Sequence, residues 1–91
     1  MKIIRRVKVK NSMGLHTRPA TVIVKMLQTC KCSVHFTCKR ETVNAKSLLS
    51  ILMLAAQKNC SITITTEGVD AELVADKLVM AFEDEFGERT A

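Results

Sequence analysis

The sequence predicts an α+β fold, an open-faced β-sandwich in which a four-stranded antiparallel sheet carries three helices on one face. Four segments alternate apolar and polar residues, the period of a strand with one wet face. Three others repeat apolar residues every three to four positions, as amphipathic helices do. Together they follow the order β-α-β-β-α-β-α. Because the strands are polar on one side, the helices should cover only the other, leaving a face rich in lysine, arginine and threonine.

The first two elements are predicted to be a strand and a helix. The strand covers residues 5–10, where valines alternate with basic residues. The helix is expected to have His16 or Thr17 at its N-cap and to end near Gln28, and Pro19 suits its first turn because no intrahelical hydrogen bond is lost there. Its apolar stripe consists of Ala20, Ile23, Val24 and Leu27.

The middle of the chain is predicted to form two strands and a short helix. The strands cover residues 30–39 and 42–45, with a turn between them. The helix covers residues 47–56, with Ser47 as its N-cap and Asn59 in the left-handed conformation that often closes a helix. The core face of the first strand is expected to consist of Cys32, Val34, Phe36 and Cys38.

The last two elements are predicted to be a strand over residues 61–66 and a helix capped by Asp70. Residues 85–91 are expected to form a frayed tail. The apolar stripe of the helix consists of Ala71, Val74, Leu78 and Phe82.

The composition indicates a small globular protein. Hydrophobic residues make up 47% of the 91 residues and the mean hydropathy is +0.13, so a modest core is expected in one domain, residues 1–91, acting as a monomer. No apolar run reaches the roughly 18 residues of a spanning helix, so no membrane insertion is expected. The first residues lack the apolar segment of a signal peptide, which predicts a cytoplasmic protein with four reduced cysteines.

The net charge of +5 favours acidic partners. Lys8, Lys10, Lys31 and Lys39 are expected to make the open face of the sheet basic. A nucleic-acid-binding module would use such a face, but it would also need aromatic side chains there to stack on bases. Aromatic residues make up only 3% of the chain, and Phe36 belongs to the core face of its strand. We therefore expect no nucleic-acid partner and interpret the lysines as solvated.

The spacing of Cys30, Cys32, His35 and Cys38 invites a zinc site, but the alternation argues against it. In a strand, Cys32 and Cys38 point to the core side while His35 points to the opposite side, so the ligands of a tetrahedral site cannot converge. We predict no metal site and interpret these cysteines as small apolar residues, with Cys60 standing apart from them.

Residues 14–20, G-L-H-T-R-P-A, are the most informative segment for function. They place His16 at the start of a helix, where free N–H groups and the helix dipole stabilise an anion such as phosphate. An ordinary histidine titrates near pH 6.5, so a neutral ring nitrogen is available at cytoplasmic pH to attack phosphorus. Arg18 would neutralise part of the charge of the transferred group. The segment predicts a phosphohistidine site formed by His16 and Arg18.

These residues, together with N-A-K-S-L-L-S-I-L at 44–52, closely resemble the HPr family, the histidine-containing phosphocarriers of the bacterial sugar phosphotransferase system. The resemblance runs from about Ile4 to Glu88. It implies that His16 accepts a phosphoryl group on Nδ1 from Enzyme I, which phosphoenolpyruvate charges, and passes it to EIIA domains. No cofactor is implied, and the chain alone is not expected to be a complete enzyme.

The same resemblance implies that Ser47 is the serine modified by HPr kinase/phosphorylase in bacteria that have that enzyme. A phosphate at this helix start would border an apolar patch and hinder docking by charge repulsion and desolvation. The alternative is a plain N-cap serine worth about 1 kcal/mol. The residues expected to contact partners are Thr17, Ala20, Lys46, Leu48, Leu49 and Leu52.

A second function is left open by these residues. A regulatory relative, in a nitrogen-type phosphotransferase branch or signalling through Ser47, would keep the same histidine, so His16 does not separate it from a sugar-transport carrier. The sequence departs from the family pattern in the loop at residues 11–13, which is less glycine-rich than in many relatives, and at Asn59, where relatives usually have glycine. Neither departure involves His16 or Arg18.

Overall fold

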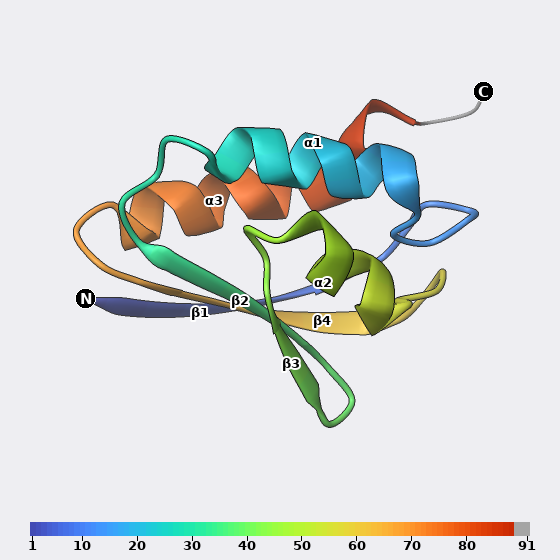
Figure 1. Ribbon diagram of the computed structural model, residues 1–91, viewed down its shortest axis with the longest axis horizontal. Helices are drawn as coiled ribbons and strands as arrows, with labels where there is room; N and C mark the ends of the chain where they lie inside the picture. Colours follow the sequence, from blue (N-terminus) through green and yellow to red (C-terminus); the bar gives the residue numbers. More distant parts are fainter. Residues whose placement is uncertain (89–91) are drawn as a thin grey trace.

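The computed structural model describes residues 1–88, and its elements follow the predicted order. The helices lie on one face of a single four-stranded sheet (Figure 1). The strands follow the spatial order β1-β4-β2-β3, and every neighbouring pair is antiparallel. The elements are β1 (Lys2–Lys8), α1 (Thr17–Leu27), β2 (Ser33–Cys38), β3 (Glu41–Asn44), α2 (Leu48–Leu54), β4 (Ser61–Glu67), α3 (Ala71–Glu83) and the 3₁₀ turn η1 (Glu85–Gly87).

The core lies between the sheet and the helices and includes all three phenylalanines. Phe36 of β2 packs edge-to-face on Phe82 of α3 at a centroid distance of 5.6 Å, and Phe82 packs in the same way on Phe86 at 4.8 Å. All three are less than 10% exposed. The predicted stripes of α1 and α3 also lie in or against this core. The open face of the sheet therefore lacks, within residues 1–88, the aromatic side chains that a base-stacking surface needs.

The open face carries basic residues and threonines, as predicted. Register places Arg6 beside Thr63, and Thr63 beside Thr37 on the next strand. Thr37 in turn shares a hydroxyl hydrogen bond of 2.8 Å with Thr42. Three of the four lysines expected on this face lie outside the strands: Lys10 follows β1, and Lys31 and Lys39 lie in the segments that flank β2. The face is basic mainly along β1.

β1 begins three residues earlier than predicted. Arg5 faces the helix side between Ile3 and Val7, and this charged residue on the apolar side interrupts the alternation of apolar and polar residues in the sequence. Its guanidinium extends past the core to Asp76 of α3, 3.7 Å away. Long basic side chains reach solvent in this way while their stems stay on apolar surface.

α2 is shorter than predicted because Ala55 takes the left-handed conformation, with φ of 53°, and ends it. The expected left-handed residue Asn59 has φ of 74°, but it lies in the loop before β4 and does not close the helix. Its N–H donates to the carbonyl oxygen of Val9 at 2.7 Å and ties this loop to the end of β1.

Asp70 precedes α3 as predicted, but its carboxylate does not cap that helix within the described residues. It accepts hydrogen bonds of 2.8 Å from the backbone N–H groups of Lys31 and Cys32. These bonds hold the pKa of the Asp70 carboxyl below its ordinary value, and the bond from Lys31 has the largest effect. Asp70 thus joins the start of α3 to the segment before β2.

The cysteines differ from the prediction of four thiols. Cys38 and Cys60 form a disulfide, and Cys60 is therefore not isolated. Tertiary structure brings them together, because Cys38 ends β2 and Cys60 precedes its partner β4. Their Cα atoms are 7.2 Å apart, beyond the usual ~6.8 Å. Cys30 and Cys32 are free, and burial above all raises the pKa of the Cys32 thiol to about 12.

Residues 85–88 are ordered, which corrects the prediction of a frayed tail; residues 89–91 of that tail lie outside the described residues. Phe86 is buried against Phe82 and anchors the turn that follows α3. None of the helices formed by residues 1–88 is both long and apolar enough to cross a bilayer.

Candidate functional site

His16 is the N-cap residue of α1, as predicted, with extended backbone (φ −78°, ψ −168°). The preceding loop turns tightly: Gly14 has φ of 69°, and its N–H donates to the carbonyl oxygen of Asn11 at 3.0 Å. A side chain at Gly14 would strike the carbonyl of Ala56, which also accepts a hydrogen bond from Leu15. Glycine is needed here for both its positive φ and its small size. This loop delivers the imidazole to the helix start.

The surroundings of His16 suit a transferred anion. The first N–H groups of a helix have no intrahelical partner, and the dipole adds partial positive charge. The His16 side chain is 29% exposed, so a partner can reach it, whereas that of Arg18 is 77% exposed and free to adjust. His16 also accepts the first helical bond, from the N–H of Ala20 at 3.0 Å. An exposed guanidinium close to an imidazole at a helix start is an arrangement suited to phosphate.

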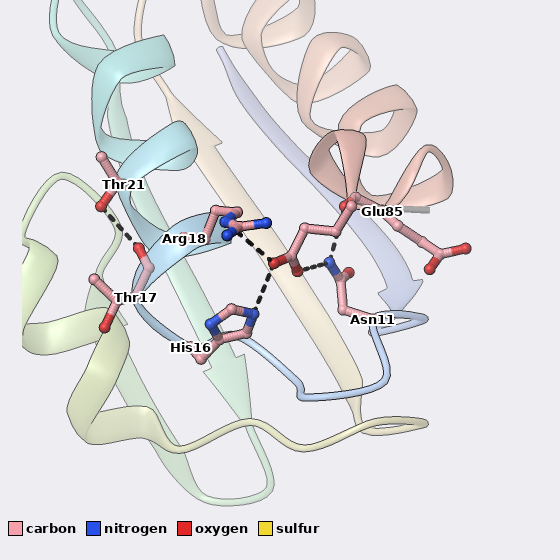
Figure 2. A network of polar contacts seen from close by, with 7 residues as sticks. Asn11, His16, Thr17, Arg18, Thr21 and Glu85 are labelled. Carbon is pink, nitrogen blue, oxygen red and sulfur yellow. Dashed lines mark hydrogen bonds and ion pairs between the residues drawn. The ribbon is translucent and has the colours of Figure 1, made fainter. Parts of the chain in front are cut away.

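A carboxylate from the other end of the described chain completes the site. Oε2 of Glu88 lies 2.8 Å from Nε2 of His16 and 3.9 Å from Nε of Arg18. Oε1 of Glu88 accepts a hydrogen bond of 2.7 Å from Nδ2 of Asn11, and the same Nδ2 donates to the carbonyl oxygen of Glu85 at 2.8 Å. Figure 2 shows these contacts joining the loop, the start of α1 and the turn after α3.

Sequence reasoning missed Asn11 and Glu88. Asn11 lies in the loop before α1 and Glu88 in the segment expected to fray, and neither position belongs to a periodic pattern. One signal in the sequence favoured an ordered tail, namely Phe86, a large apolar residue that would be costly to leave in water. Its burial brings Glu88 to the histidine.

Ser47 is the N-cap residue of α2, as predicted, and its Oγ accepts a hydrogen bond of 3.2 Å from the N–H of Ser50. Lys46 is exposed, and its Nζ donates to the carbonyl oxygen of Cys30 at 3.3 Å. α1 and α2 are in contact, so the two N-cap residues belong to neighbouring helices (Figure 1).

α2 presents an apolar surface to solvent. Leu48 and Leu49 are exposed and Leu52 is half-buried, as expected of residues outside the core, whereas Ile51 and Leu54 are buried. Met53, which sequence reasoning did not single out, is 70% exposed and lies one helical turn after Leu49. At the end of α2, Ala55 is exposed and Ala56 is buried.

The prediction that Ala20 contacts partners is wrong. Ala20 is fully buried, because it begins the stripe by which α1 packs on the core. Thr17 is exposed, and its carbonyl oxygen accepts a hydrogen bond of 2.7 Å from Oγ1 of Thr21. Ala20 therefore supports the site from below and is not part of its surface.

Two further features of the described residues bear on the chemistry of the His16 site, namely their potential metal ligands and a hollow. Within residues 1–88, no group of three or more His, Cys, Asp and Glu side chains is arranged to hold a metal ion. A hollow of about 780 Å³ lies between the β2–β3 turn and the segment before β4, and its lining includes Arg40 and Lys58 but neither His16 nor Ser47. This hollow is therefore separate from the histidine site.

Comparisons with known proteins agree on one family. The family model described as "PTS HPr component phosphorylation site" matches residues 3–84. A phosphocarrier protein HPr from Chlamydia pneumoniae is 45% identical over 80 residues, which cover 88% of this chain and 74% of the relative. A phosphocarrier protein NPr from Proteus mirabilis is 33% identical, covering 92% of this chain and 94% of the relative.

A solved structure agrees with this result. The crystal structure of HPr-C-His from Thermoanaerobacter tengcongensis superposes with a TM-score of 0.92 at 30% identity, covering 97% of this chain and 99% of that one. Its fold is the open-faced sandwich described above. The sequence match, the shared fold and the histidine at a helix start together show that this chain belongs to the HPr family of phosphocarriers of the phosphotransferase system.

Proposed function

We propose that His16 accepts a phosphoryl group from Enzyme I, itself charged by phosphoenolpyruvate, and passes it to histidines of EIIA domains in sugar uptake. The observation that carries the proposal is the partly exposed imidazole at the N-terminus of α1, with the guanidinium of Arg18 in the first turn of the same helix. The family model, described by its phosphorylation site, supports it.

The chemistry needs little more than these groups. Phosphoryl transfer depends mainly on positioning and on stabilising charge, and the partner supplies the remaining groups. Nδ1 of His16 attacks phosphorus while the bond to the donor breaks. The dianion formed on Nδ1 is stabilised by the helix N-terminus and by Arg18. The phosphoryl group stays transferable because it is bonded to a ring nitrogen at an open surface.

The proposed docking surface extends from Thr17, next to this histidine, to the neighbouring helix α2, which carries its apolar part. Exposed apolar side chains next to an active residue are a common binding surface. We add Met53 to it because of its exposure, and we leave out the buried Ala20. The docking surface consists of Thr17, Lys46, Leu48, Leu49, Leu52 and Met53.

Ser47 is the proposed regulatory site, modified by HPr kinase/phosphorylase where the organism has that enzyme. Its Oγ already occupies the N-cap of α2, so a phosphate there would be held by the free N–H groups with little refolding. The added charge would lie beside Leu48 of the docking surface. We expect phosphorylated Ser47 to block partner binding by desolvation cost and repulsion.

We further propose that the chain works in the cytoplasm as a monomer formed by one domain, residues 1–91. The shared core of all elements, and a family of phosphotransferase-system carriers, favour this. The alternative is a regulatory relative, in a nitrogen-type branch or signalling through Ser47. The likeness to the NPr protein of Proteus mirabilis favours the nitrogen-type branch over signalling through Ser47. The identity of the accepting EIIA domain distinguishes a nitrogen-type carrier from a sugar carrier.

The test is incubation with Enzyme I and phosphoenolpyruvate, followed by intact mass. We expect an acid-labile gain of one phosphate that is absent in His16→Ala. Transfer to EIIA domains of the sugar and nitrogen types is then compared. No gain with an active, cognate Enzyme I would overturn the carrier function and leave Ser47 as the site to examine.

A further inference from the structure

The two ring nitrogens of a neutral imidazole have different roles. One carries the proton and donates, and the other has the lone pair and can attack. In His16, Nε2 lies 2.8 Å from Oε2 of Glu88. An ionised carboxylate can only accept, so this contact requires the proton on Nε2 and leaves the lone pair on Nδ1.

The carboxylate that makes this contact is itself fixed. Its other oxygen accepts from Nδ2 of Asn11 at 2.7 Å, and Asn11 is only 1% exposed. The Glu88 side chain is 14% exposed, whereas Arg18 nearby is largely in solvent. Two residues earlier, Phe86 is buried against Phe82 and holds the backbone of the turn. Glu88 is therefore anchored both through its side chain and through its turn.

We propose that Glu88 is a positioning residue that selects the Nε2-protonated form of His16 and so makes Nδ1 the phosphoryl acceptor. The proposal rests on the function proposed above for His16 and adds to it a residue outside both motifs. A carboxylate that orients a histidine and fixes its tautomer is a recurring device in hydrolases and metal sites.

The step balances without any further group. The lone pair of Nδ1 forms the bond to phosphorus while the bond from phosphorus to the donor breaks, its electron pair staying on the donor. The proton remains on Nε2, hydrogen-bonded to Glu88, so the phosphorylated ring is cationic. Glu88 offsets that charge. In onward transfer the protonated ring is a better leaving group than an anionic imidazole, so the same contact serves both directions.

Replacement of Glu88 by glutamine gives an unusual expectation. Nδ2 of Asn11 is a donor and would hold the oxygen of the new side-chain amide toward itself, so the amide NH₂ would face Nε2 of His16. Nε2 would then have to accept, and the proton would move to Nδ1. Glu88→Gln should thus invert the tautomer, whereas Glu88→Ala should only remove the preference.

Nitrogen-15 NMR of the ring at a pH where His16 is neutral reads the tautomer directly. We expect the proton on Nε2 in the unmodified protein, on Nδ1 in Glu88→Gln, and divided between the two in Glu88→Ala. A proton on Nδ1 in the unmodified protein overturns the proposal without any variant. So does an unchanged pattern in a folded Glu88→Gln protein.

Transfer from phosphorylated Enzyme I provides the second measurement. We expect Glu88→Gln to lower the rate constant by roughly tenfold to a hundredfold, the usual effect of losing such a partner, and Glu88→Ala to lower it less. If Glu88 only anchored the turn, alanine would be the more damaging change, and that order would refute the proposal. Glu83→Gln removes the same charge from an exposed residue of α3 and should leave the rate unchanged.

Failure of the two proposals can be told apart. If the unmodified protein gains no phosphate, the function of His16 is wrong whatever its tautomer. If it gains phosphate as expected but Glu88→Gln changes neither the ring nitrogens nor the rate, only the role of Glu88 is wrong.

Discussion

At the scale of single residues, Arg18 combines high exposure with a position next to the histidine. Its Nε is 3.9 Å from Oε2 of Glu88, a long contact for an ion pair. Because the Arg18 side chain is 77% exposed, this long contact should contribute at most about 1 kcal/mol to stability. We therefore expect the guanidinium to pair with an incoming phosphoryl group and to contribute more to transfer than to folding.

We predict that Arg18→Ala lowers the rate of transfer to an EIIA domain by about tenfold or more, because a charge-assisted contact to phosphate is lost. Quenched-flow transfer measures the rate, and the free energy of unfolding should change by less than about 1 kcal/mol. Arg5→Ala is a matched control, since Arg5 also forms an exposed pair, 3.7 Å from Asp76 on α3. An unchanged rate in Arg18→Ala would remove Arg18 from the mechanism.

The four cysteines are predicted to differ in reactivity. The thiolate is the reactive form, and burial raises the pKa of Cys32 to about 12, so Cys32 should resist alkylation in the native protein at about pH 8. Half-buried Cys30 should react first. Cys38 and Cys60 should react only after reduction. Alkylation followed by peptide mass mapping, native and then unfolded, checks this order; four thiols without reductant would show that the disulfide is absent.

At the scale of elements, α2 follows its N-cap residue Ser47 and carries the apolar part of the proposed docking surface. A carboxylate serves as well as a hydroxyl at an N-cap. Ser47→Asp should therefore keep the helix and add a charge next to Leu48, which is 39% exposed. This separates the effect of charge from any effect on folding.

We predict that Ser47→Asp slows acceptance of phosphate from Enzyme I by several-fold or more while the melting temperature stays close to that of the unmodified protein. Rapid-mixing kinetics and thermal unfolding give the two quantities. Ser47→Asn keeps a capping group without charge and should transfer normally. Normal acceptance in Ser47→Asp would argue against regulation by blocked docking.

The start of α3 depends on Asp70 through its bonds to Lys31 and Cys32. These bonds lower the pKa of the Asp70 carboxyl below 3.8, so its stabilising contribution is complete above that pH and is lost as pH falls through the lowered value. Asp70→Asn should thus lower the melting temperature at pH 7, because an amide offers one acceptor oxygen and a competing donor.

That loss should shrink as pH falls through the lowered pKa of the Asp70 carboxyl, because the unmodified carboxyl then becomes protonated as well. Thermal unfolding at about pH 7, 4 and 2 follows the difference between the two proteins. Asp76→Asn, a change on the exposed side of α3, should have little effect at any of these pH values because its pair with Arg5 is a surface pair. A constant difference across pH would mean that Asp70 acts by another route.

Sequence alone predicted the element order, the core side of the sheet and the N-cap positions of His16 and Ser47, because each of these leaves a local signal. Alternation and helical spacing place Phe36 and Leu78 in the core, and both are fully buried. The segment 14–20 carries its own chemistry. These predictions depend only on residues close together in the chain.

What the sequence could not predict depends on tertiary contacts. Glu88 reaches His16 only because Phe86 packs on α3, 4.8 Å from Phe82. Likewise, the Asp70 carboxylate does not cap α3, because it accepts a hydrogen bond from the N–H group of Lys31, which is far away in sequence. Pairings of this kind have no periodicity to reveal them.

At the scale of the whole molecule, the fold separates two basic surfaces. The open sheet face carries Arg6 and Lys8 along β1, while Lys25 of α1 and Lys46 before α2 belong to the helical layer with His16. The helices cover one face of the sheet only (Figure 1), so the two basic surfaces lie on opposite sides of the molecule. With a net charge of +5, both could attract acidic partners at long range.

Steering by local charge depends on where the charges lie, and this gives the last prediction. The double variants Lys25→Gln/Lys46→Gln and Arg6→Gln/Lys8→Gln each remove two positive charges and so lower the net charge of +5 equally. We predict that the first slows phosphate transfer from Enzyme I by roughly tenfold at low salt, and that the second changes it by less than about twofold. The difference should fade at about 0.5 M salt, where the Debye length is only a few ångströms. Rapid-mixing kinetics at several salt concentrations measure the transfer rates of both variants. Equal slowing by the two variants would mean that net charge alone, and not the helical face, governs encounter with the partner.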